Sequence, residues 1–145
     1  MNCMKEAEHK LRDYIARKHA LESTREEIAR LEAESTCVRS ATTDSTPVLG
    51  GGNARETAML NNIAARSELE KAYQSTAEWV RIVDGALQLL DPEERLILDR
   101  FYVHRHRGHA ERLMEELHIE QSQVYRRKND ALRHFALVLY GVVET

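Results

Sequence analysis

The stretch that decides the fold is AERLMEELHIEQSQVYRRKNDALRHF, residues 110–135. In its first half Leu113, Met114 and Leu117 recur at steps of three and four residues, which places side chains on one face of an α-helix. A brief connection, residues 118–120, leads to a second segment with the same period. The stretch therefore predicts two short helices joined by a tight turn, a helix-turn-helix.

The second segment has an apolar face and a polar face. The apolar face consists of Val124, Ala131, Leu132 and Phe135, and Ile119 fills the turn before it. Residues 121–136 carry four basic residues and one acid, in a chain whose net charge is −3. Such donors, acceptors and positive charges suit base edges and phosphates, so we expect helix 121–136 to enter the major groove of DNA. The predicted DNA-binding residues are Gln121, Ser122, Gln123, Tyr125, Arg126, Arg127, Lys128, Asn129 and Arg133.

A further helix is predicted just before this pair. Asp91 suits the N-cap, Pro92 the first helical position and Glu94 the third position of a capping box. Its expected buried face consists of Leu96, Ile97, Phe101 and Tyr102, and Gly108 lies in the turn that follows. Three helices are therefore expected between residue 92 and about residue 140.

The N-terminal part shows two long helical periods, residues 2–34 and 54–90, separated by residues 35–53. The separating stretch is rich in Ser and Thr, contains Pro47 and ends in three glycines, a composition typical of a flexible linker. Lys18 and Arg25 interrupt the apolar stripe of the first period. Trp79 and Tyr73 on the second are interpreted as core residues or as a partner surface.

These patterns predict an all-α protein of two parts. Residues 1–90 form a long helical hairpin, a coiled-coil-like arm, and residues 91–145 form a three-helix helix-turn-helix module. The sequence leaves open whether the long helices pair within one chain or between two chains in a homodimer.

Composition excludes several classes of function. With a net charge of −3 and a pI near 6.2, the chain cannot bind nucleic acid by bulk charge, so a DNA surface must be local. Cys3 and Cys37 fit no paired framework and are expected to be free thiols. No signal peptide or membrane span is recognisable, and no motif indicates an enzyme or a cofactor.

The histidines at 104, 106 and 109 alternate with Arg105 and Arg107. They suit an ordinary exposed turn, a loop that touches phosphates, or zinc ligands. Because no carboxylate or thiol is spaced to complete a metal site, no metal is predicted here.

The residues from Leu90 to Tyr102, with Leu113, Leu117, Ile119, Val124, Ala131 and Leu132, resemble region four of bacterial sigma factors. More narrowly, the C-terminal third resembles the phage late-gene transcription regulators of the ArpU and RinA type. The resemblance implies a cytoplasmic, phage- or prophage-encoded activator that binds double-stranded DNA through Gln121, Ser122 and Tyr125, with Arg126 at the groove edge. It also implies a contact with RNA polymerase.

The sequence departs from the sigma-like pattern at three positions. A small residue is usual where Met114 stands, a glycine or short polar residue where His118 stands, and an apolar residue where Arg127 stands. Two other functions fit the same architecture. One is a terminase-like protein of DNA packaging, and the other is a protein-interaction module with a vestigial helix-turn-helix.

Overall fold

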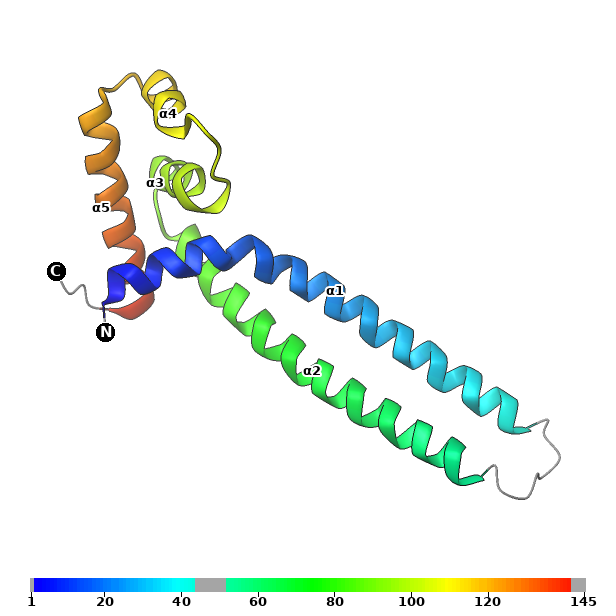
Figure 1. Ribbon diagram of the computed structural model, residues 1–145. Helices are drawn as coiled ribbons and strands as arrows, with labels where there is room; N and C mark the ends of the chain where they lie inside the picture. The colour runs from blue at the N-terminus through cyan, green and yellow to red at the C-terminus, as the bar shows by residue number, and fades with distance from the viewer. Residues whose placement is uncertain (1, 44–51, 142–145) are drawn as a thin grey trace. The chain divides into compact units, whose positions relative to one another are not determined.

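The computed structural model describes residues 2–43 and 52–141, and every regular element in these ranges is a helix (Figure 1). The elements are α1 (Cys3–Thr43), α2 (Gly52–Gln88), α3 (Pro92–Leu98), the π-helical turn η1 (Asp99–Val103), α4 (His109–Leu117) and α5 (Gln121–Tyr140). The prediction of an all-α protein is confirmed for these residues. Within the same ranges, no helix combines the length and the apolar character needed to cross a membrane.

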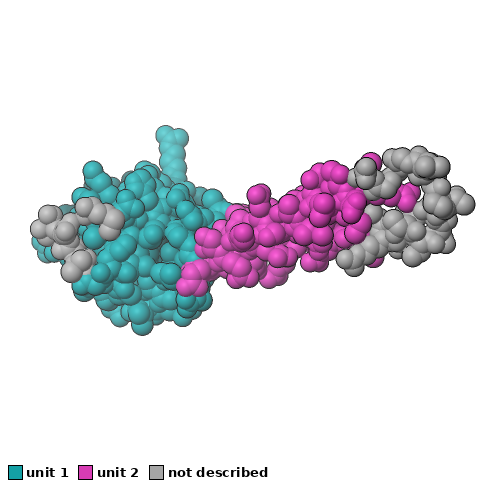
Figure 2. Space-filling view, turned by 90° about the horizontal axis from the view of Figure 1, so that it is seen from below, with its two compact units in different colours: residues 1–18, 79–145 teal, residues 19–78 magenta. Residues whose placement is uncertain are grey.

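The chain divides into two compact units (Figure 2). Unit 1 comprises residues 1–18 and 79–145, and unit 2 comprises residues 19–78. The sequence places its boundary at residue 90 instead. The two divisions differ because the first turns of α1 and the last turns of α2 pack with the C-terminal helices, a long-range contact that composition does not reveal.

The expected linker, residues 35–53, is partly helical. α1 continues to Thr43 and α2 begins at Gly52. A helix can absorb the hydroxyl residues that suggest a loop, because a threonine hydroxyl can bond to a carbonyl one turn earlier. Thr36 does so, donating to the carbonyl oxygen of Glu32 at 3.1 Å. The rest of the expected linker, residues 44–51, lies outside the described residues.

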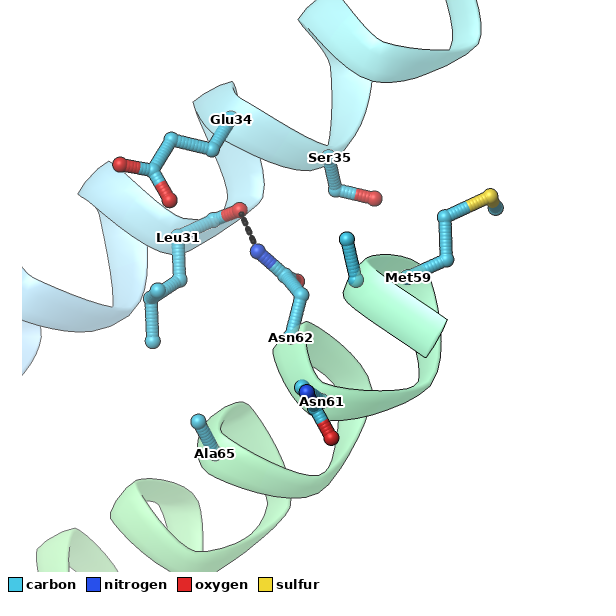
Figure 3. A pocket seen from close by; sticks show the side chains of 8 residues that line it. Leu31, Glu34, Ser35, Met59, Asn61, Asn62 and Ala65 are labelled. Atoms are coloured by element: carbon cyan, nitrogen blue, oxygen red, sulfur yellow. Dashed lines mark hydrogen bonds between the residues drawn. The ribbon is translucent and has the colours of Figure 1, made fainter. Parts of the chain in front are cut away.

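Unit 2 joins segments of α1 and α2, and hydrogen bonds cross between them. The Asn62 Nδ2 donates to the Leu31 carbonyl oxygen at 2.9 Å (Figure 3), and the Arg25 guanidinium donates to the Tyr73 hydroxyl at 3.0 Å. The later residue of α1 meets the earlier residue of α2, so the two segments are antiparallel within this unit. Tyr73 is half-buried and Leu31 is buried.

Unit 1 contains the main hydrophobic core. Phe135, Leu11, Ile97 and Leu98 are its largest fully buried side chains. Each helix that reaches the unit contributes to this core. Its members are Cys3, Ala7, Leu11, Tyr14, Val80, Val83, Ala86, Leu90, Ile97, Leu98, Phe101, Tyr102, Ala110, Leu113, Val124, Ala131, Leu132, Phe135 and Ala136.

One predicted core residue of α3 is misplaced. Leu98 is fully buried, whereas the expected Leu96 is only half-buried. Ile97, Leu98, Phe101 and Tyr102 follow the spacing of a single helix face, and Leu96 lies one position off it. The predicted start of this helix is confirmed, since Asp91 is the N-cap and its N–H donates to the Glu94 carboxylate at 3.2 Å in a capping box.

Trp79 is half-buried in unit 1 beneath two cations of α1. The Arg17 guanidinium lies 4.4 Å from its ring centroid and the Lys10 ammonium 5.8 Å from it. The same Lys10 Nζ lies 6.0 Å from the Tyr140 ring, so α1 contacts the last turn of α5. Trp79 thus has an intramolecular packing role, one of the two interpretations that the sequence leaves open.

Candidate nucleic-acid interface

A three-residue turn joins α4 to α5, and its backbone is unusual at one residue. His118 adopts φ 55° and ψ 47°, and its N–H donates to the Met114 carbonyl. The Ile119 N–H donates to the same oxygen at 3.2 Å. This left-handed residue closes α4 and turns the chain, a task for which glycine is the usual choice. The sequence departure at His118 therefore falls at a turn position that favours glycine.

α5 begins directly after this turn. Glu120 has an extended backbone, and its carbonyl oxygen accepts hydrogen bonds from the Gln123 and Val124 N–H groups at 3.0 and 3.1 Å. The helix then continues to Tyr140, and Gly141, with φ 77°, caps it by donating its N–H to the Leu137 carbonyl at 2.8 Å.

One face of α5 is buried and the opposite face is exposed. The predicted apolar face is confirmed, since Val124, Ala131 and Phe135 have no exposed surface and Leu132 is 5% exposed. Steps of three and four residues define an exposed stripe on the other side, which we call the reading face. It consists of Ser122, Tyr125, Arg126, Asn129 and Arg133.

The nine residues predicted to bind DNA fall into two groups on α5. Six are exposed, namely the five residues of the reading face and Gln121 at the first helical position. The other three, Gln123, Arg127 and Lys128, are half-buried at the flanks of the stripe. The reading face therefore brings together most, but not all, of the predicted set.

The flank toward α3 is held by charged contacts. The Arg127 guanidinium forms an ion pair with the Glu93 carboxylate, and the His134 Nδ1 lies 3.0 Å from both oxygens of the Glu94 carboxylate. Arg127 thus supports the packing of α5 on α3, where the sigma-like pattern has an apolar residue. The predicted contact of Arg127 with DNA would compete with this ion pair.

The other flank carries an aromatic cluster. Phe101 of η1 meets Tyr125 edge-on at 5.7 Å between ring centroids, and it meets His109 at 4.5 Å. The Lys128 Nζ lies 5.5 Å from the centroids of both Phe101 and Tyr125. Edge-on aromatic pairs and cations over rings are each attractive, so this cluster fixes Tyr125 at the edge of the reading face.

The histidine-rich turn is organised by local hydrogen bonds. His104 Nδ1 lies 2.7 Å from the Asp99 carboxylate, and His109 Nδ1 lies 2.9 Å from the His106 carbonyl oxygen. In the described ranges, no three His, Cys, Asp or Glu side chains are close enough together to hold a metal ion.

Sequence reasoning missed the contribution of Glu93 and Phe101 to this surface. The sequence assigns no individual role to Glu93, and it places Phe101 only in the core. The contact of Glu93 with α5 could have been suspected from Arg127. The sigma-like pattern has an apolar residue at that position, and a cation there is expected to pair with an acid nearby. No comparable signal in the sequence indicates the π-helical turn that places Phe101.

No family model matches this chain, and neither a curated protein nor a solved structure does.

Proposed function

We propose that this protein binds double-stranded DNA with sequence preference and regulates transcription. In this proposal α4, the turn at His118 and α5 form a helix-turn-helix, α3 supports it, and α5 enters the major groove. The observation that carries the proposal is the reading face, an exposed polar and basic stripe backed by a buried face of the same helix.

Four members of the reading face, and Gln121 beside it, have a chemistry that suits DNA. Arg126 can donate two hydrogen bonds to a guanine, and Asn129 can pair with an adenine edge. Arg133 lies two turns beyond Arg126 on α5, where its guanidinium suits a contact with a phosphate. Gln121 and Ser122 lie at the helix N-terminus, where free backbone N–H groups also favour a phosphate.

The biological setting of the proposal rests on the resemblance to sigma region four and to the phage late-gene regulators. On that basis we propose a cytoplasmic activator of phage late genes that also contacts RNA polymerase. We further infer that α1 and α2 form a helical hairpin arm within one chain, because the contacts between them are antiparallel in each unit.

The test uses DNA selected by the protein from a random library and fluorescence anisotropy at several salt concentrations. Arg126→Ala should weaken binding by about 1–3 kcal/mol and relax the preference at one base position. Lys128→Ala should weaken all sequences alike and lower the salt dependence. Lys71→Ala, which removes an exposed charge in unit 2, is the control and should leave affinity unchanged.

Three results would count against the proposal or redirect it. Equal affinity of the wild type and both α5 variants would remove this helix as the recognition element. Absence of any salt-sensitive DNA binding would favour a protein-interaction module. Ring-shaped oligomers in light scattering would favour a DNA-packaging protein, whereas a protected palindrome in footprinting would indicate a dimer on promoter DNA.

A further inference from the structure

Unit 1 also has a groove that no residue of α5 lines. Segments of α1, α2, α3 and η1 enclose this groove of about 550 Å³, within the size range of small-molecule sites. Its floor is apolar and comprises Ile15, Leu87, Pro92, Leu96 and Val103. This floor accounts for the exposure of Leu96, a residue that the sequence assigns to the core.

The rim of the groove is cationic. Lys18 and Arg95 line it, and both are exposed. The acid at the rim, Asp99, is already bonded to His104 at 2.7 Å. The hydrogen bond with the Tyr14 hydroxyl raises the pKa of the Lys18 ammonium above its usual value.

The carboxylate of Asp84, which is close to Lys18, offsets part of this positive charge. Asp84, which does not itself line the groove, accepts a hydrogen bond from the Tyr14 hydroxyl, and its charge also acts on Lys18. Arg95 has no such acid among the contacts that the structure gives. Lys18 and Arg95 are the two cations of the groove that an acid group on a ligand could contact.

The π-helical turn η1 lines the groove and also contacts the reading face. η1 places Asp99 and Val103 at the groove, and it places Phe101 against Tyr125 at 5.7 Å. Turns of this kind often occur at functional sites in helical proteins. A ligand that moves Val103 would also move Phe101, and Phe101 positions Tyr125.

We propose that this groove binds an apolar organic anion, a molecule with an aromatic or aliphatic body and one carboxylate or sulfonate, and that its binding changes the affinity for DNA. The apolar floor takes the body, and Lys18 and Arg95 take the acid group. The effect on DNA rests on the proposed DNA-binding function, whereas the ligand site does not.

The ligand site is tested with 8-anilinonaphthalene-1-sulfonate and its uncharged counterpart N-phenyl-1-naphthylamine, followed by fluorescence titration of the full chain. We expect saturable binding of one sulfonate per chain and weaker binding of the neutral compound. The double variant Lys18→Met/Arg95→Met should lose about tenfold in affinity for the sulfonate, the size of one charge-assisted contact. Affinity for the neutral compound should stay the same.

Lys71→Met is the matched control, because it removes one exposed charge from unit 2. Circular dichroism checks that each variant keeps its helices. Equal binding of the two compounds would overturn the assignment of an anion. So would wild-type affinity for the sulfonate in the Lys18→Met/Arg95→Met variant, which would place the bound dye elsewhere.

The coupling is tested by measuring DNA affinity with and without saturating sulfonate. We expect a change of about fivefold or more, and an equal change of sulfonate affinity when DNA is bound, because coupling between two sites is reciprocal. Unchanged DNA affinity with the dye bound would overturn the coupling. Absence of all DNA binding, with the dye site intact, would contradict the proposed function and leave the ligand site standing.

Discussion

Arg127 of α5 and Glu93 of α3 form an ion pair across the helices that support the reading face. Both side chains are partly open to water, 41% and 43% exposed. A pair so exposed contributes little to stability, about 0–1 kcal/mol, but it fixes where one of the three consecutive cations of α5 points. Arg126, the neighbour of Arg127, is turned to the exposed stripe instead.

Because of this difference, we expect Arg126 and Arg127 to contribute unequally to DNA binding. Arg127→Ala should lower the free energy of unfolding by less than about 1 kcal/mol, and it should weaken DNA binding less than Arg126→Ala does. Urea denaturation and fluorescence anisotropy on the same DNA measure both effects. Equal losses of DNA affinity in the two variants would show that Arg127 leaves Glu93 to contact DNA.

The turn before α5 provides a prediction about stability. His118 holds a left-handed backbone at φ 55°, which costs an L-residue with a Cβ about 1–2 kcal/mol. His118→Gly relieves this cost but adds freedom to the unfolded chain, so we expect a net gain of about 0.5–1 kcal/mol. Chemical denaturation measures it. His118→Ala keeps the Cβ and serves as the control, which should show no such gain.

The sequence predicted the C-terminal helices well because their signals are local. The capping residues Asp91 and Glu94 and the apolar period of Val124, Ala131 and Phe135 act within one helix. Such signals depend on neighbours three or four residues away, which the sequence displays directly. The exposed face of α5 followed from the same period.

The packing of α1 in unit 1 could not be predicted in this way. Leu11 and Tyr14 were assigned to an arm, yet they are buried with residues more than 60 positions away, as the bond between Tyr14 and Asp84 shows. An amphipathic period identifies the face that is buried but not the element that covers it. The groove beside Leu96 was missed for the same reason.

Two glycines in helical surroundings should respond oppositely to the same substitution. A Cβ at Gly85 of α2 would meet nothing within 4 Å, so Gly85→Ala should stabilise the protein by about 0.5–1 kcal/mol through helix propensity. Gly141, at φ +77°, also has open space around its Cβ position, but its backbone is left-handed. Gly141→Ala should therefore destabilise by about 1 kcal/mol.

Thermal unfolding of the two variants beside the wild type measures this contrast. Space is open at both positions, so any difference in sign comes from the backbone alone. Destabilisation by Gly85→Ala would mean that the face around Gly85 touches another molecule or segment closely in solution.

Alkaline pH should destabilise unit 1 through its buried tyrosines. Burial, with the nearby Glu8 carboxylate, raises the pKa of Tyr102 from 10.0 to about 12. Burial also raises the pKa of Tyr14 and of Tyr140. The unfolded chain therefore releases these phenolic protons at lower pH than the folded chain does. Stability is fully present below pH 10 and is lost as the pH rises from 10 toward 12.

For Tyr102 alone the loss across that window is on the order of 2 kcal/mol. Tyr102→Phe removes the ionising group, so the fall in stability above pH 10 should become shallower while the contributions of Tyr14 and Tyr140 remain. Urea denaturation at a series of alkaline pH values measures the slope. An unchanged slope in Tyr102→Phe would show that this phenol is solvated in the folded protein, and hence that α1 does not cover it in solution.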